Sequence, residues 1–84
     1  MINNNNDIRA LWKIAKEIRL DWKNVYFGAV PYLEAMDELT TIDDMFYMDS
    51  GRHIVMYFLS NATTWRGDTA RRIKAELKAL LNNK

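Results

Sequence analysis

The longest unbroken run of large apolar residues in the chain is Ile54–Leu59. It is too short to span a bilayer, which takes about 20 apolar residues, so we expect it to be buried inside the protein. Asp49 and Ser50 precede it and are good helix N-caps, and residues 60–64 supply a stop. No segment with alternating apolar and polar residues lies nearby to pair with it as a strand. The pattern predicts a helix over 51–61 that is apolar nearly all round and forms the central core element.

Apolar residues spaced three and four apart predict three further helices. The first covers 6–22, with Asn6 as its N-cap, and its stripe is Ile8, Leu11, Ala15, Ile18 and Trp22. The second covers 29–39, because a proline such as Pro31 is tolerated in a first helical turn but not in a helix interior. The last covers 64–82, capped by Thr63 or Thr64, with the stripe Ala70, Ile73, Leu77 and Leu80.

These elements predict an all-α fold, a bundle of about four helices around helix 51–61. The short connection between the last two helices predicts that they pack antiparallel. Residues 40–44 are expected to form a loop, and residues 45–48 either a short helical turn or an irregular strap. The whole chain, 1–84, is interpreted as one helical domain in which residues 1–5 are disordered.

The composition indicates the cellular compartment in which this domain is expected. A chain of 84 residues is a single small domain, and it contains no cysteine. Disulfides, thiolate metal sites and cysteine nucleophiles are therefore excluded, and a small domain without such staples is typical of the cytoplasm. The first residues have neither the basic nor the apolar region of a signal peptide. We expect a cytoplasmic protein with no membrane contact.

The net charge of +1 conceals an uneven distribution. Residues 7–23 carry a net charge of +2, residues 24–62 of −5, and residues 63–84 of +4. One interpretation is that the acidic middle of the chain lies beside the basic ends and balances them. The other is a polarised binding surface.

Candidate catalytic groups are few. His53 is the only histidine, and a single histidine at the start of a helix is more typical of packing or capping than of general-base catalysis. Asp43, Asp44 and Asp49 lack the spacing, central glycine and terminal glutamate of a calcium loop. The chain has no glycine-rich phosphate loop, metal-ligand cluster or activated-serine motif. We therefore expect a protein that is not an enzyme and that has no cofactor and no metal.

Nucleic-acid binding is one candidate function. The last predicted helix and the residues before it carry cations that could contact phosphates, with Trp65 available for stacking, namely Arg66, Arg71, Arg72, Lys74 and Lys78. The nearly neutral chain and the antiparallel helix pair speak against a dedicated nucleic-acid protein. A basic face that is merely solvated is the alternative, and any binding is expected to be weak.

Protein binding is the other candidate function. The chain has ten aromatic residues, more than so small a core is expected to bury, and Tyr, Trp and Met are favoured at interfaces. The segment most suited to remain exposed is Met45, Phe46, Tyr47 and Met48, flanked by Asp43 and Asp44, with Tyr26 and Phe27 next. We expect this segment to bind a protein partner or a second copy of the chain. The alternative is that it folds as a strap over the bundle.

Two segments carry a resemblance to known sequences. They are WKNVYFGAVPYL at 22–33 and YFLSNATTWRG at 57–67. In these segments the chain resembles a group of small uncharacterised bacteriophage and prophage proteins, and the resemblance extends from Asp7 to Leu80. It implies an accessory protein in the bacterial cytoplasm that binds a host or phage protein, as host-takeover and anti-defence factors do. It implies no catalytic residues and does not identify the partner.

Overall fold

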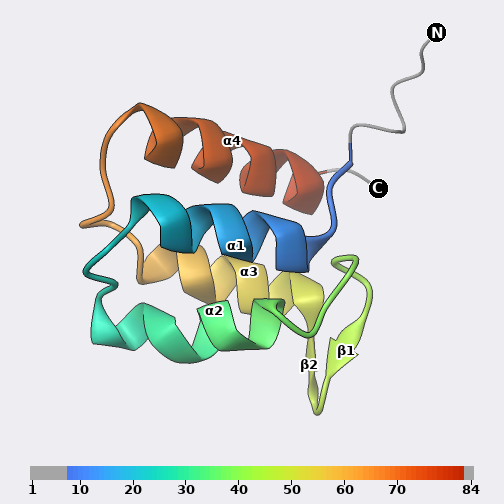
Figure 1. Cartoon of the computed structure of the whole chain (residues 1–84). Coiled ribbons are helices and arrows are strands. Elements are labelled where there is room, and N and C mark those ends of the chain that lie inside the picture. Colours follow the sequence, from blue (N-terminus) through green and yellow to red (C-terminus); the bar gives the residue numbers. More distant parts are fainter. Residues whose placement is uncertain (1–7, 83–84) are drawn as a thin grey trace, which may run out of the picture.

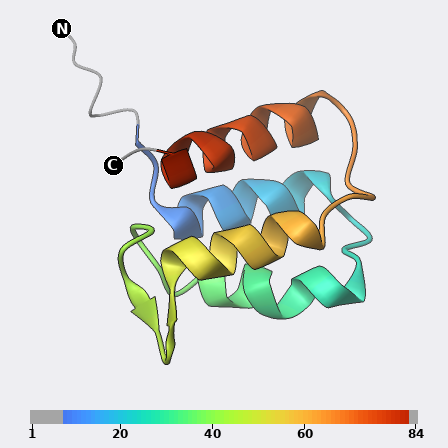
Figure 2. The same ribbon diagram turned by 180° about the vertical axis from the view of Figure 1, so that it is seen from behind.

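The computed structural model describes residues 8–82, which form four α-helices and one β-hairpin. The elements are α1 (Leu11–Asp21), a 3-10 turn (Phe27–Ala29), α2 (Val30–Met36), β1 (Met45–Phe46), β2 (Asp49–Ser50), α3 (Gly51–Ser60) and α4 (Asp68–Asn82). Successive helices run in opposite directions, and α3 and α4 are antiparallel as predicted (Figure 1). Figure 2 shows the same layers from behind, with α1 and α3 between α2 on one side and α4 on the other. The centre of the bundle is thus shared by two helices.

The first helix begins later than its sequence pattern predicts. Leu11, Ala15 and Ile18 of the predicted stripe are buried, but Ile8 is exposed and residues 8–10 are not helical, so the stripe is confirmed only from Leu11 on. Ala10 precedes the helix and provides no side-chain cap. Backbone carbonyls from another part of the chain take that role: the Leu11 N–H donates to the Thr40 carbonyl and the Trp12 N–H to the Leu39 carbonyl, both at 3.0 Å. The predicted cap Asn6 and the predicted disordered residues 1–5 lie outside the described residues.

The second helix starts where expected, with Pro31 in its first turn, but it ends at Met36. Beyond it the chain tightens into turns, in which the Glu38 N–H donates to the Ala35 carbonyl and the Leu39 N–H to the Met36 carbonyl. Leu39 is nevertheless buried, so the predicted inward face persists beyond the helix.

The apolar run forms a helix, α3, as predicted. The Ser50 hydroxyl accepts a hydrogen bond from the His53 N–H at 3.2 Å, which confirms the expected N-cap. Ile54, Val55 and Phe58 are buried and Leu59 is partly buried. The helix is not buried all round, however, because Met56 and Tyr57 remain exposed on its outer face.

The start of α3 packs closely on the loop before the hairpin. A Cβ on Gly51 would approach the Thr41 carbonyl oxygen to 2.8 Å and the Ile42 Cα to 2.9 Å, so this position admits only glycine without movement of the loop. The same approach lets the Arg52 N–H donate to the Ile42 carbonyl at 2.8 Å. The loop therefore completes the first turn of α3 as well as that of α1.

Three aromatic rings contact one another in the core. Trp22 and Trp65 stack with ring centroids 5.6 Å apart, and Phe58 meets both in edge-to-face geometry. The Trp65 indole N–H donates to the Asp21 carboxylate at 2.9 Å. Because Trp65 turns into the core, α4 begins at Asp68 rather than at residue 64, and residues 61–67 form a longer connection than predicted.

Residues 45–48, for which the sequence predicted either a short helical turn or an irregular strap, belong to a two-stranded antiparallel hairpin. Met45 pairs with Ser50 and Phe46 with Asp49, so Tyr47 and Met48 occupy the turn. It is neither a helical turn nor an irregular strap, and the all-α description is therefore approximate. In both views the hairpin projects beyond the helices at the end where α3 begins (Figures 1 and 2).

Candidate functional site

The hairpin carries the most exposed large apolar residues among those described. We call Met45, Phe46, Tyr47 and Met48 the hairpin patch. Tyr47 is 86% exposed and Met48 is 91% exposed, whereas Phe46 is partly buried against the core. The Phe46 ring meets the Tyr47 ring edge to face, with centroids 4.7 Å apart. The patch thus has a half-buried base, Phe46, and a fully solvated tip.

Tyr47 has an unusual backbone conformation. Its φ of 57° makes it the one non-glycine residue with positive φ among residues 8–82. A positive φ at the first of two turn residues matches a type II′ turn, where glycine is preferred because it has no Cβ to clash. A bulky residue in this region is held at an energetic disadvantage. The hairpin therefore presents a tyrosine where its own folding favours glycine.

Two carboxylates border the patch. A shallow groove of about 580 Å³ lies between the hairpin and the C-terminal end of α2, and its lining includes Glu34, Glu38, Met45 and Tyr47. Neither glutamate forms an ion pair within residues 8–82. The sequence analysis did not single out these two residues, although their i,i+4 spacing in a predicted helix could have placed them on one face. The rim of the patch is therefore acidic and uncompensated.

The two aspartates predicted to flank the patch have other neighbours. The Asp44 carboxylate accepts hydrogen bonds from the N–H groups of Thr40 and Thr41, both at 2.9 Å, and from the Thr41 hydroxyl. The Thr41 N–H and then the Thr40 N–H lower the pKa of Asp44, because they stabilise the ionised form. Asp43 lies beside Arg52, with 3.7 Å between the Asp43 Oδ1 and the guanidinium. Asp44 thus organises the loop, and Asp43 faces α3.

The predicted basic residues of the C-terminal region are largely engaged within the protein. Arg71 pairs with Asp68, and Arg72 pairs with Glu17 on α1. Lys74 donates to the Trp65 carbonyl at 2.7 Å, and partial burial, followed by the neighbouring cations Lys78 and Arg66, lowers its pKa. Of the five predicted residues, only Arg66 and Lys78 form no ion pair or hydrogen bond with the part of the chain that is described.

A four-residue ion network joins α4 to α1. Arg9 forms a bidentate pair with Glu76, at 2.9 and 2.6 Å, and also contacts Glu17 at 2.8 Å. Glu17 in turn pairs with Arg72, and the two guanidinium groups, Arg72 first, lower the pKa of Glu17. These charges hold helices together, which leaves fewer of them for an external ligand.

The structure does not group His53 with Asp43, Asp44 and Asp49, the residues weighed above for catalysis or metal binding, into a catalytic centre. His53 is exposed on α3, and its ring stacks on Tyr57 at a centroid distance of 6.2 Å. Within residues 8–82 there is no group of three or more His, Cys, Asp or Glu side chains that could hold a metal ion. In that same range no helix has the length and apolar character needed to cross a membrane.

Comparison with known proteins finds no matching family model, no matching curated protein and no matching solved structure. A proposal on function therefore rests on the geometry of the hairpin patch and of the basic helix α4.

Proposed function

We propose that the protein is a non-enzymatic interaction module that binds another protein through the hairpin patch. The observation that carries this proposal is the exposure of Tyr47 and Met48 at the tip of a hairpin that projects from the bundle. Aromatic rings supply contact area with few torsions to fix, and methionine adapts to the shape of a partner. Tyrosine is also enriched among the residues that contribute most to binding energy.

The backbone at Tyr47 supports a role in binding. Glycine would fold more easily at a φ of 57°, so a tyrosine there is not explained by the stability of the hairpin. Unfavourable backbone conformations of this kind concentrate at binding and catalytic sites. A side chain that is exposed and unfavourable for the fold is a reasonable candidate for contact with a partner.

The acidic rim defines the chemistry of the partner. Glu34 and Glu38 line the groove beside Tyr47, and Asp49 lies across the strand pair from Phe46. Complementary charge speeds association and disfavours wrong partners. We therefore propose a partner surface with an apolar centre and basic margins. The resemblance to phage and prophage proteins predicts that this partner is a host or phage protein in a bacterial cytoplasm, and that remains a prediction.

The test compares two variants with matched losses of apolar surface. Tyr47→Gly with Met48→Ser removes the tip of the patch while placing glycine where positive φ favours it. Leu20→Ser with Phe27→Ser removes two comparably exposed apolar side chains on α1 and the 3-10 turn. A partner captured from nuclease-treated bacterial lysate should be purified and should bind the wild type and the control variant alike. We expect its affinity for the hairpin variant to fall at least tenfold, at unchanged helical content.

Other outcomes would count against the proposal. Equal binding of the partner to both variants would remove the hairpin patch as the site. Recovery that disappears with nuclease would favour the alternative function, nucleic-acid binding through Arg66, Arg71, Arg72, Lys74 and Lys78. Reversal of Arg66 and Lys78 to glutamate should then abolish it, because these two cations have no ion pair or hydrogen bond within residues 8–82. A mass that increases with concentration in the wild type but not in the hairpin variant would identify the partner as a second copy of the chain.

A further inference from the structure

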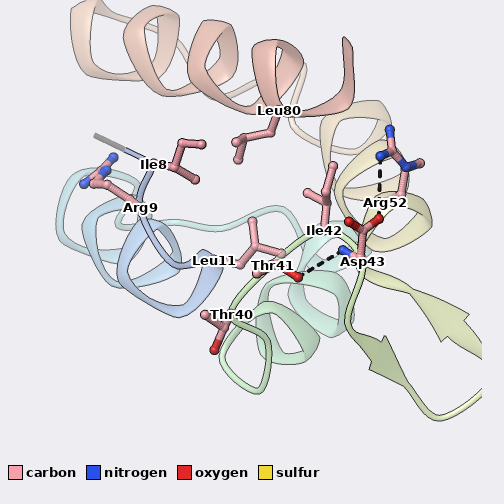
Figure 3. A pocket seen from close by; sticks show the side chains of 9 residues that line it. All are labelled: Ile8, Arg9, Leu11, Thr40, Thr41, Ile42, Asp43, Arg52 and Leu80. Atoms are coloured by element: carbon pink, nitrogen blue, oxygen red, sulfur yellow. Dashed lines mark hydrogen bonds and ion pairs between the residues drawn. The ribbon is translucent and has the colours of Figure 1, made fainter. Parts of the chain in front are cut away.

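A cavity lies at the opposite edge of the loop from the hairpin. It has a volume of about 240 Å³ and opens between the start of α1, the end of α4 and residues 40–43 (Figure 3). Four aliphatic side chains from three parts of the chain surround it, namely Ile8, Leu11, Ile42 and Leu80. An apolar cavity of about 150 Å³ can already hold benzene, so this one has room for a longer aliphatic chain.

Two arginines border the cavity, and Arg52 is less engaged with other groups than Arg9 is. Arg9 directs its guanidinium to Glu76 and Glu17, which occupy three of its nitrogens. Within residues 8–82 the Arg52 guanidinium makes one hydrogen bond, from Nη1 to the Leu81 carbonyl at 2.8 Å. Its 3.7 Å contact with Asp43 is too long for a hydrogen bond. A guanidinium has five N–H donors, so Arg52 can still bind an anion.

The Asp43 contact would not prevent this. The Asp43 side chain is 85% exposed, and a surface ion pair of this length contributes little to stability. A carboxylate that approaches Arg52 from the cavity can take two parallel hydrogen bonds, which is the preferred geometry between guanidinium and carboxylate. Asp43 can turn toward water when this happens.

We propose that this cavity binds a small aliphatic carboxylate, with its chain among Ile8, Leu11 and Leu80 and its carboxylate on Arg52. The site is separate from the hairpin patch and does not depend on the proposed function. A bound chain would touch α1, α4 and the loop together, so it would stabilise their mutual packing.

The test uses sodium butanoate, hexanoate and octanoate, with 1-hexanol as the neutral match for hexanoate. Titrations are followed by calorimetry and by the methyl NMR signals of Ile8, Leu11, Ile42 and Leu80. We expect saturable binding that tightens about threefold to fourfold with each methylene until the cavity is full. Hexanoate should bind about tenfold or more tightly than hexanol, because only hexanoate engages the guanidinium.

Two variants separate the two parts of the site. Arg52→Gln should weaken hexanoate binding about tenfold and leave hexanol binding unchanged, whereas Arg19→Gln, which removes a guanidinium paired with Asp37, should change neither. Leu80→Trp should fill the cavity and abolish binding of both ligands. The hairpin variant Tyr47→Gly with Met48→Ser should bind hexanoate as the wild type does.

Several results would overturn the proposal. They are titrations without saturation, chemical-shift changes spread over the hairpin as well as the cavity, or equal affinities for hexanoate and hexanol. The last comparison uses the unaltered protein, so it decides the role of the charge even if Arg52→Gln fails to fold. Unchanged hexanoate binding in folded Leu80→Trp would also exclude the cavity.

Discussion

The two sides of the bundle use their charged residues differently. On the α1 and α4 side, Arg9, Glu17, Arg72 and Glu76 pair with one another across helices that are far apart in sequence. On the side of α2 and the hairpin, Asp37 pairs with Arg19, but Glu34 and Glu38 form no ion pair within residues 8–82 and stand beside exposed apolar residues. Charges that are paired internally serve the fold, and charges left beside an apolar patch remain available to a partner.

The two sides also differ in how they are connected to the core. The α1 and α4 pairs link residues separated by 67 and 55 positions, so they depend on the whole fold. The hairpin is formed by six consecutive residues and is tied to the core mainly through Phe46. Changes at its tip should therefore affect binding without affecting folding, whereas changes on the other side should affect stability.

The largest expected effect lies in the core that both sides share. Phe58 is fully buried and makes edge-to-face contacts with Trp22 and Trp65. Phe58→Ala should lower the free energy of unfolding by about 3–5 kcal/mol, because it removes a large ring and leaves a cavity. For a small domain this is enough to unfold much of the protein. Thermal and urea denaturation followed by circular dichroism would measure it.

The matched control is Phe27→Ala. Phe27 is 79% exposed, so its truncation should change the free energy of unfolding by less than about 0.5 kcal/mol. If Phe58→Ala were tolerated equally well, the stacked aromatic core would not be the main source of stability.

The sequence predicted this core better than it predicted the ends of the helices. Spacing of apolar residues identified the buried faces of all four helices, because the buried stripe follows directly from helical geometry. The predicted starts of α1 and α4 were wrong, because the positions at which these helices begin depend on contacts between distant segments. The Thr40 carbonyl caps α1, and burial of Trp65 delays α4 until Asp68. Such contacts leave no local signal in the chain.

A smaller effect separates the base of the hairpin from its tip. Phe46→Ala should lower the free energy of unfolding by about 1–2 kcal/mol, because part of its ring packs on the core. Tyr47→Ala should change it by less than about 0.5 kcal/mol, since that side chain is almost fully exposed. Urea denaturation of the two single variants tests the difference. Equal losses would mean that the tip of the hairpin supports the fold as its base does, which would contradict its role in binding.

The ion network on the other side should contribute still less. Glu76→Gln removes the bidentate partner of Arg9 and should lower the free energy of unfolding by about 1 kcal/mol, since the pair belongs to a network at the protein surface. High salt should reduce the difference between variant and wild type. Glu38→Gln, which removes an unpaired carboxylate, should have an effect near zero. A larger loss of stability from Glu38→Gln than from Glu76→Gln would contradict the proposed difference between the two sides of the bundle.

The candidate site could be predicted from the sequence only in part. The run of methionine and aromatic residues at 45–48 left two outcomes open, an exposed patch or a strap over the bundle, and the structure exposes Tyr47 and Met48 while Phe46 packs against the core. The acidic partners were assigned by proximity in the chain, to Asp43 and Asp44. The structure instead places Glu34 and Glu38 beside the hairpin, since the loop at 40–44 uses Asp44 for its own backbone.

The smallest predicted effect concerns that loop and pH. Hydrogen bonds from Thr41 and Thr40 lower the pKa of Asp44 below its ordinary value of 3.8, so the folded protein favours the ionised carboxylate. This contribution to stability is present above pH 3.8 and is lost as the pH falls through the lower pKa of the folded state. Hydrogen exchange of the Thr40 and Thr41 amides should therefore be slow near neutral pH relative to Asp44→Asn, and the difference should shrink in acid. Asp43→Asn, at a carboxylate that faces Arg52, should leave both amides as they are in the wild type. Equal protection in Asp44→Asn and the wild type at neutral pH would show that the loop is held by its packing on Gly51 rather than by Asp44.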